Sequence, residues 1–319
     1  MTGFNLQALL DGNRRALAKA ITLVESTLGT HREQAQEILE QVLPHSGNSI
    51  RIGISGVPGV GKSTFIEAFG LHLIGQGKRV AVLAVDPSSP IAGGSILGDK
   101  TRMEELSRRE EAFIRPSPAA GALGGVAQKT RETMLLCEAA GYDVILVETV
   151  GVGQSEYQVA GMVDFFMVLM LPGGGDELQG IKKGILELAD ALVINKADGE
   201  SAHLAQMARQ HYTSAMNLLR HTSFWTPRVM TCSALEGVNI DAVWGMVLDY
   251  YLQAIEEEAF QQKRSRQNRD WMHQLVQQML MLRLKQNPAV KAMLPELERA
   301  VAEQEMTAYA AARQIMEQL

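Results

Sequence analysis

Short apolar runs recur along the middle of the chain and alternate with longer segments of helical spacing. Seven of them are expected to be strands: Ile50–Ser55, Arg79–Val85, Ala112–Arg115, Tyr142–Glu148, Phe165–Leu171, Ala191–Asn195 and Arg228–Thr231. Strands that alternate with helices indicate an α/β fold, with a mostly parallel sheet and helices on both of its faces. Ligands of such folds bind at the carboxyl ends of the strands.

The two ends of the chain have a different pattern, with helical spacing and no strand signal. Residues 5–43 have the apolar spacing of two amphipathic helices, with one face marked by Leu6, Leu9, Leu10, Leu17, Ile21 and Val24. Pro44–Asn48 is a polar break. We therefore expect an N-terminal helical segment (1–48), a central α/β domain (49–251) and a C-terminal helical arm (252–319).

In the C-terminal arm an apolar stripe recurs at helical spacing, formed by Trp271, Leu275, Met279 and Leu282. Such a stripe is usually a packing surface against another helix or subunit. The alternative is a recognition helix that binds in a partner's groove.

The first motif follows the first predicted strand and is typical of a phosphate-binding loop. Its glycines allow the backbone to approach a triphosphate closely. Backbone N–H groups and the amino end of the helix expected over Thr64–Ile74 would then stabilise the negative charge of the phosphates. Lys62 is expected to reach the β- and γ-phosphates, and the Ser63 hydroxyl to bind Mg²⁺. The expected nucleotide-binding residues of the loop are Gly56, Val57, Pro58, Gly59, Val60, Gly61, Lys62, Ser63 and Thr64.

A second motif, Asn195-Lys196-Ala197-Asp198, follows the predicted strand 191–195 and indicates guanine recognition. The Asp198 carboxylate can accept from both N1–H and the exocyclic amino group of guanine, and adenine offers no such pair of donors. Lys196 is expected to lie over the base. Ser233, Ala234 and Leu235 follow the last predicted strand as a supporting loop. These motifs favour GTP and GDP over adenine nucleotides.

Carboxylates at strand ends supply candidate magnesium ligands beside Ser63. Glu148 ends a predicted strand where most GTPases carry aspartate, and Gly151 follows at the position whose amide senses the γ-phosphate. Asp86 and Asp99 are the other two candidates, because oxygen ligands suit Mg²⁺. Lys62, Glu148 and Gly151 are the expected catalytic residues.

The residue that would orient the attacking water is not evident. Val152 stands where many small GTPases carry glutamine, and the nearest glutamine is Gln154. An activating arginine could be Arg102 or could come from a partner. We therefore expect slow intrinsic hydrolysis that a partner accelerates.

Composition excludes several classes of function. A net charge of −6 argues against a nucleic-acid-binding surface. Cys137 and Cys232 lie far apart in apolar or motif contexts and are expected to be buried free thiols. The seven histidines form no cluster, which weakens a nickel-delivery role. The sequence shows neither a secretory signal pattern nor an apolar run long enough to span a membrane, so we expect a cytoplasmic protein.

Together these motifs resemble the MeaB/ArgK family, the GTPases associated with methylmalonyl-CoA mutase. The segments that carry the resemblance are 56–64, 85–90, 93–103, 148–156 and 173–184. The resemblance implies a homodimeric GTPase chaperone that gates the loading of cobalamin onto the mutase and protects the mutase from inactivation. It also favours a dimer arm at the C-terminus. An older interpretation of the family, as a kinase or ATPase of arginine and ornithine transport, fits poorly with the motif at 195–198.

The glycine-rich segment Gly173–Gly184 follows a predicted strand where a helix would ordinarily begin at once. Glycines lower the cost of changing backbone conformation there. The segment is either a flexible surface connection or, as the resemblance implies, an extra switch that relays the nucleotide state to the partner. In the second case Lys182 and Lys183 are candidate contacts.

Overall fold

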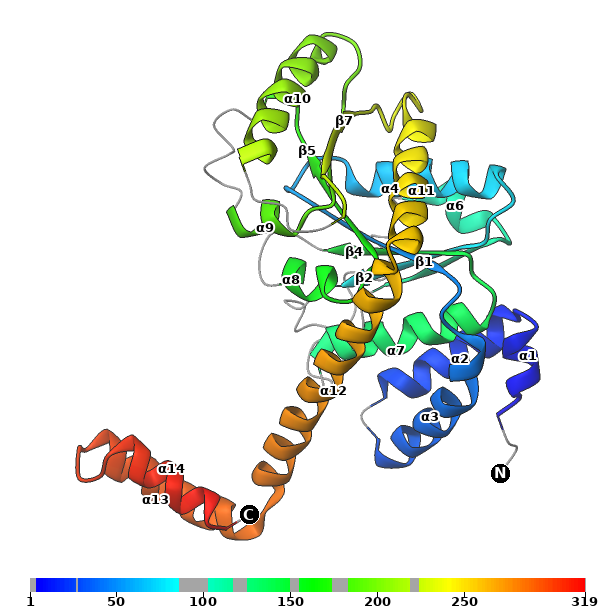
Figure 1. The fold of residues 1–319 in the computed structure, drawn as a ribbon. Coiled ribbons are helices and arrows are strands. Elements are labelled where there is room, and N and C mark those ends of the chain that lie inside the picture. Colours follow the sequence, from blue (N-terminus) through cyan, green and yellow to red (C-terminus); the bar gives the residue numbers. More distant parts are fainter. Residues whose placement is uncertain are drawn as a thin grey trace. The chain divides into compact units, whose positions relative to one another are not determined.

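The structure is a computed structural model that describes residues 4–26, 28–85, 103–116, 125–149, 155–173, 183–218 and 224–318. Most of the predicted glycine-rich segment, residues 174–182, therefore lies outside the described residues. The chain forms two compact units, Met1–Arg264 and Ser265–Leu319. The first unit contains the sheet and every strand of the described residues, and the second is helical (Figure 1).

One seven-stranded sheet, parallel throughout, forms the centre of the first unit, with the order β3-β2-β4-β1-β5-β6-β7. The predicted α/β fold with a mostly parallel sheet is therefore confirmed. The strand bounds are β1 Ile50–Gly56, β2 Val80–Val85, β3 Ala112–Arg115, β4 Val144–Thr149, β5 Phe165–Met170, β6 Ala191–Ile194 and β7 Arg228–Thr231.

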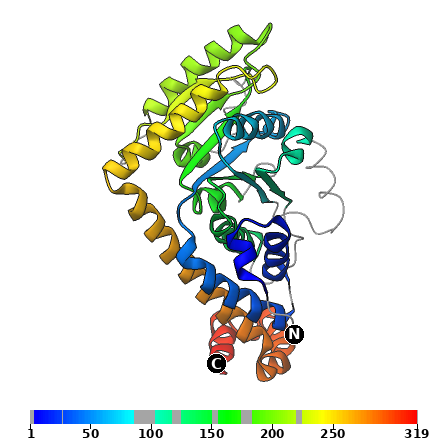
Figure 2. The ribbon, with the colours of Figure 1, turned by 90° about the vertical axis from the view of Figure 1, so that its right-hand side faces the viewer.

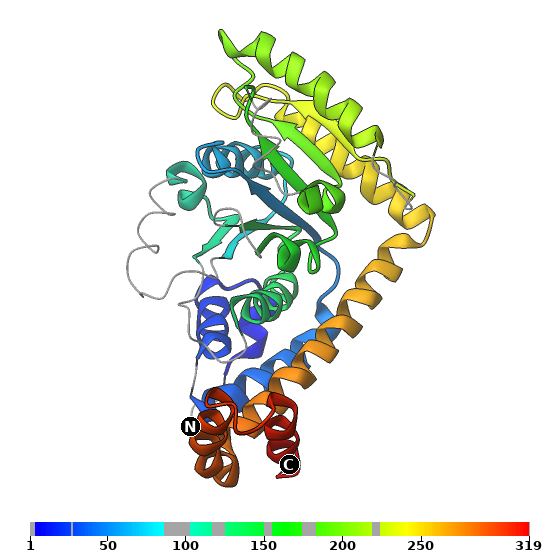
Figure 3. The ribbon, with the colours of Figure 1, turned by 90° about the vertical axis from the view of Figure 1, so that its left-hand side faces the viewer.

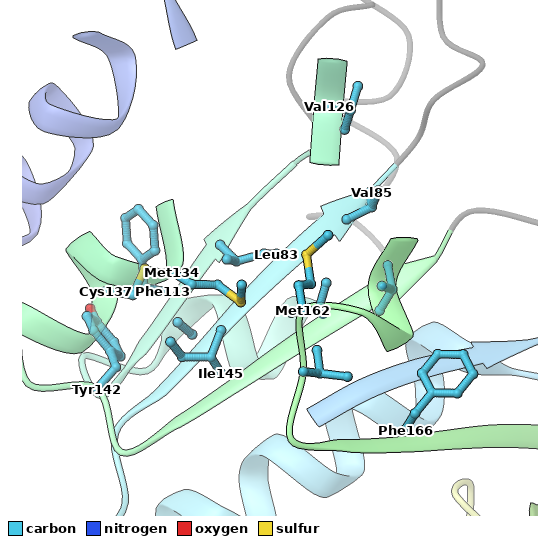
Figure 4. Close-up of a cluster of buried hydrophobic side chains, with 14 of the residues drawn as sticks. Leu83, Val85, Phe113, Val126, Met134, Cys137, Tyr142, Ile145, Met162 and Phe166 are labelled. Carbon is cyan, nitrogen blue, oxygen red and sulfur yellow. The ribbon is translucent and has the colours of Figure 1, made fainter. Parts of the chain in front are cut away.

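Both faces of the sheet are covered, as predicted, because successive strand residues point to opposite sides. In β4, Ile145 and Val147 belong to one hydrophobic cluster and Val144 and Leu146 to the other. Figure 4 shows the first cluster, in which Leu83 and Val85 of β2 lie with Phe113, Met134 and Ile145. A strand whose side chains are apolar at every position requires hydrophobic packing on both faces of the sheet.

Different helices bury the two faces. The first cluster is covered by α2 (Arg14–Glu25), α3 (Gly29–Val42), α7 (Gly125–Ala139), α8 (Ser155–Ala160), α9 (Lys183–Leu188) and α10 (Ser201–Leu218). The second is covered by α4 (Lys62–Gly75), α6 (Glu104–Arg108) and α11 (Ile240–Glu256). Figure 2 shows α2 and α3 in blue beside α7 in green. Figure 3 shows α4 and α6 on the opposite face of the sheet from them.

The described part of the N-terminal region contains three α-helices where the sequence predicted two. A turn at Gly12, whose φ is +78°, separates α1 (Leu6–Leu10) from α2. Asn13 then starts α2, since its side chain accepts from the backbone N–H groups of Arg15 and Ala16. The three-residue helix η1 (Leu43–His45) leads from α3 toward β1. The predicted apolar residues Leu9, Leu17 and Ile21 are nevertheless fully buried.

The beginning of α12 (Ala259–Gln286) is fixed to the amino ends of the strands by buried charges. Arg264 donates to both carboxylate oxygens of Asp164, at 2.8 and 2.7 Å, and to the carbonyls of Gly47 and Ser49, each at 2.6 Å. Arg51 of β1 pairs with Glu138 of α7 at 2.8 Å in the same buried region. Each hydrogen bond that these guanidinium groups donate offsets part of the desolvation free energy of burying their charge.

The second unit consists of the remainder of α12 with α13 (Pro288–Ala302) and α14 (Ala308–Met316). Asn287 caps α13 through Ala289 N, and its amide also donates to the Gln318 carbonyl at 2.8 Å. Of the predicted apolar stripe in α12, Met279 is 68% exposed. Within the described residues, no helix has both the length and the apolar character needed to cross a bilayer.

We predict that Arg264→Ala lowers the free energy of unfolding of the first unit by about 3–5 kcal/mol, because it leaves the Asp164 carboxylate buried without its main partner. Urea denaturation followed by circular dichroism measures this change. Arg108→Ala is the matched control, since Arg108 forms an exposed pair with Glu104; this substitution should cost less than about 0.5 kcal/mol. Equal effects of the two substitutions would contradict the importance of the buried network.

Candidate nucleotide-binding site

The predicted motifs meet at one edge of the sheet. The loop at residues 56–61 follows β1, Glu148 lies near the end of β4, Asn195 follows β6, and Ser233 follows β7. Because all these strands are parallel, their carboxyl ends share an edge, which is where ligands bind in this class of fold.

The loop after β1 has the backbone of a phosphate-binding loop. Gly59 and Gly61 have φ of +78° and +89°, a conformation that favours glycine. A Cβ on Gly61 would lie 2.9 Å from the Asn195 side-chain nitrogen. The buried Val60 side chain anchors the loop in the core, while Pro58 and Gly59 are exposed.

Helix α4 begins at Lys62 directly after this loop, and no side chain caps its amino end. The N–H groups of its first turn and the positive end of its dipole therefore suit an anion. Ser63 is half-buried in this turn, and Thr64 beside it is exposed.

The Lys62 ammonium is held at the loop by the carbonyl oxygens of Gly56, at 2.8 Å, and Val57, at 3.5 Å. Burial lowers the pKa of Lys62, and the carboxylates of Glu148 and Glu156 oppose that shift. An ammonium group has three N–H donors, so it can add a phosphate oxygen to these contacts.

Two buried carboxylates thus act on the same lysine. Glu148 was predicted from its motif, and it is paired in register with Ile54 of β1. Glu156 in the first turn of α8 was missed, although it is fully buried. It lies among polar residues in the sequence, so only the packing of α8 against β1, β4 and β5 shows its burial.

Oxygen ligands for Mg²⁺ are present in the described part of this edge, namely the Ser63 hydroxyl and the Glu148 carboxylate. These are ligands that Mg²⁺ prefers. The other predicted residues of the metal and γ-phosphate site, Asp86, Asp99 and Gly151, lie outside the described residues. Among the residues that are described, no group of three or more His, Cys, Asp or Glu side chains could hold a metal ion.

Asn195 joins the base-recognition motif to the phosphate-binding loop. Its amide nitrogen donates to the Val60 carbonyl at 2.9 Å, and its amide oxygen accepts from Ala234 N at 3.0 Å. The Cys232 thiol is a further donor to that oxygen, at 3.6 Å. One buried side chain therefore fixes three segments that are far apart in the sequence.

The neighbouring residues complete the base end of the site. Lys196 has a φ of +60° and its ammonium donates to the Gly59 carbonyl at 2.8 Å. Asp198 accepts a hydrogen bond from the Ser233 hydroxyl, which itself accepts from Glu236 N at 3.1 Å. Leu235 is 81% exposed. The Asp198 carboxylate is thus oriented by the second loop that the sequence predicted to support it.

Both cysteines are buried free thiols, as predicted. Burial raises the pKa of Cys232 to about 12 and also raises that of Cys137. Both side chains are therefore neutral thiols near pH 7, and the Cys232 thiol contacts the site as a donor to Asn195.

Comparison with known proteins agrees with this geometry. Residues 17–289 match the model of the family described as methylmalonyl Co-A mutase-associated GTPase MeaB. The chain belongs to the MeaB family of P-loop GTPases. Membership in a family of GTPases implies that the site binds guanine nucleotide.

Individual relatives cover nearly the whole chain. A putative GTPase of Caulobacter vibrioides is 55% identical over 310 residues, which is 97% of this chain and 94% of the relative. The methylmalonic aciduria type A homolog, mitochondrial, of Mus musculus is 49% identical over 92% of this chain and 73% of its own length. A crystal structure of a LAO/AO transport system kinase has a TM-score of 0.78 and 42% identity, and the match covers 98% of this chain and 95% of that one.

We predict that Asn195→Ala weakens GDP binding at least about tenfold. The substitution leaves the Val60 carbonyl and the Ala234 N–H without their partner, and each buried unpaired group costs about 1–3 kcal/mol. Isothermal titration calorimetry measures the affinity. Asn217→Ala, at an exposed position of α10, is the matched control and should bind as the wild type does. An unchanged affinity in Asn195→Ala would show that the link between the loops does not organise the site.

Proposed function

We propose that the protein binds GTP and GDP with Mg²⁺, hydrolyses GTP slowly, and acts as a chaperone of a cobalamin-dependent methylmalonyl-CoA mutase. The observation that carries the nucleotide part is the hydrogen-bonded assembly of Asn195, Lys196 and Asp198 with the phosphate-binding loop and Ser233. This assembly fixes the Asp198 carboxylate, which would accept from the guanine base, relative to the loop that would bind the phosphates.

Each part of the site has a chemical role in this proposal. The amides of the loop would donate to phosphate oxygens and Lys62 would neutralise charge on the β- and γ-phosphates, while Ser63 and Glu148, with Asp86 and Asp99, would hold the metal. The amide of Gly151 would donate to the γ-phosphate. Mg²⁺ would supply charge neutralisation between the phosphates when it is bound.

Hydrolysis without a partner is proposed to be slow because the chain lacks a glutamine at position 152. Val152 cannot orient water by hydrogen bonding. A group from a partner, or a rearrangement that a partner induces, would supply what is missing. Such dependence suits a protein whose hydrolysis is timed by the protein that it serves.

The mutase is proposed as the partner because the family description names methylmalonyl Co-A mutase and a relative is named for methylmalonic aciduria. In this role, hydrolysis gates the loading of cobalamin and the bound chaperone protects the mutase from inactivation. Neither nucleic acid nor membrane is proposed as a partner, and the proposed location is the cytoplasm.

We further propose that the protein is a homodimer joined through its C-terminal arm. Apolar side chains that would be buried by such an interface are exposed along α12, namely Met272, Val276, Met279, Leu280 and Met281. Methionine-rich surfaces of this kind pack readily against another helix.

The second candidate function is that of a kinase or ATPase of arginine and ornithine transport. It is favoured by the structural similarity to a protein that is named a LAO/AO transport system kinase. The guanine-type motif opposes it, because in this proposal the Asp198 carboxylate would accept from the two adjacent N–H donors of guanine, which adenine lacks.

We predict that Asp198→Asn exchanges the base preference of the site. The amide's NH₂ would face the amino group of guanine, so GTP affinity should fall roughly a hundredfold or more, while xanthosine triphosphate, with a carbonyl at that position, should gain affinity. Competition with a fluorescent nucleotide measures both affinities. Parallel loss of both nucleotides would mean that the substitution damages the fold instead of changing base recognition.

We also predict that the purified protein hydrolyses GTP at less than about one turnover per second and that methylmalonyl-CoA mutase raises this rate several-fold. Phosphate release is measured with GTP and with ATP, in the presence and absence of the mutase. Turnover of ATP would favour the transport role. A rate of GTP hydrolysis that the mutase does not change would contradict the mutase as partner and would favour another one.

A further inference from the structure

Strands β1 and β4 diverge at the edge of the sheet where the predicted motifs meet. Their backbone register runs as far as the pair Ile54–Glu148. Beyond this pair, Gly56 of β1 remains in register with β5, and Thr149 of β4 remains in register with β2. The helices that follow the two strands, α4 and α8, cover opposite faces of the sheet. Ligands of parallel sheets bind where neighbouring strands lead to opposite faces in this way.

A side-chain hydrogen bond joins the two strands just beyond their last backbone pair. The Thr149 hydroxyl donates to the Ser55 hydroxyl at 2.9 Å, and both residues are buried, with exposed fractions of 0% and 1%. Because side chains alternate along a strand, Thr149 points to the same face of the sheet as Ile145 and Val147 of the first cluster, and Glu148 points to the other face. The hydroxyl pair therefore lies in the core and can act on the site only through the backbone of the two strands.

Packing alone does not require hydroxyl groups at these two positions. The preceding part of β4, Val144–Val147, is apolar, and valine would fill the space of Thr149 with a methyl group in place of the hydroxyl. A buried hydroxyl without a partner is unfavourable, so each of these two groups makes the other necessary. The pair adds a defined spacing between β1 and β4 beyond the point at which their backbone pairing sets it.

From this arrangement we propose that Thr149 is a positioning residue of the magnesium site, which acts by holding the ends of β1 and β4 together through Ser55. The proposal rests on the proposed binding of guanine nucleotides with Mg²⁺. Glu148 directly precedes Thr149, and the loop that leads to Ser63 begins directly after Ser55. The two candidate ligands are thus carried by the two strands that the hydroxyl bond joins. Because Mg²⁺ demands near-ideal octahedral geometry, a change in this spacing weakens metal binding more than nucleotide binding.

Release of N-methylanthraniloyl-GDP from the purified protein, followed by fluorescence at a series of Mg²⁺ concentrations and in EDTA, tests this proposal. A metal ion that bridges the phosphates and the protein slows release, so the Mg²⁺ concentration at half of this effect reports the metal affinity. In Thr149→Val this concentration should rise about fivefold or more, as expected for the loss of one buried hydrogen bond. Release in EDTA should stay close to that of the wild type. Thr149→Ser keeps the hydroxyl and should restore the wild-type response.

Thr130→Val is the matched control. The buried hydroxyl of Thr130 donates to the Val126 carbonyl of its own helix, at 2.9 Å, and this variant should respond to Mg²⁺ as the wild type does. A second approach starts from the acceptor: Ser55→Ala should raise the Mg²⁺ requirement as Thr149→Val does. The double variant should add little to the larger single effect, because both substitutions remove the same bond.

A wild-type Mg²⁺ requirement in both Thr149→Val and Ser55→Ala would overturn the proposal. So would a Thr149→Ser variant that behaves as Thr149→Val does, or an equal rise in Thr130→Val. Release that accelerates in EDTA by the same factor would place the effect on the nucleotide and would also contradict a role toward the metal. A wild type that binds the labelled GDP but whose release Mg²⁺ does not slow would overturn the proposed metal binding itself.

Discussion

The candidate site depends on the side-chain amide of Asn195. Its two polar ends bind the phosphate-binding loop through Val60 and the last loop of the sheet through Ala234, and both bonds are shielded from water. A buried amide whose donor and acceptor are both used holds its partners at a defined distance, because breaking either bond leaves an unpaired polar group. The separation between the phosphate end and the base end of the site is set in this way.

This arrangement works because the sheet brings the loops together beforehand. The strands that precede the loops are parallel and buried on both faces, so their carboxyl ends are fixed by the core and not by the ligand. At the opposite edge, Arg264 and Asp164 fix the start of α12 to the same strands. The amino edge of the sheet thus anchors the start of α12, and the carboxyl edge is left for nucleotide chemistry.

Charge at the phosphate end is arranged around Lys62. The lysine is held by backbone carbonyls and lies in the field of two buried carboxylates, only one of which belongs to the predicted metal set. Glu156, one of these two carboxylates, belongs to α8, the helix that also packs against α9. The same short helix therefore takes part in the electrostatics of the site and packs against α9.

The sequence by itself determined the strands, their parallel arrangement and the edge at which the motifs meet. These features depend on local apolar patterns and on residues close together along the chain, such as the glycines before Lys62. It did not determine the third N-terminal helix, because the turn at Gly12 interrupts one continuous apolar pattern. Tertiary structure alone decided the burial of Glu156, the hydrogen bonds by which Asn195 joins two distant loops, and the contact of Tyr157 with Gly184. Each of these depends on which surfaces of distant segments meet, and that is fixed only when helices pack on the finished sheet.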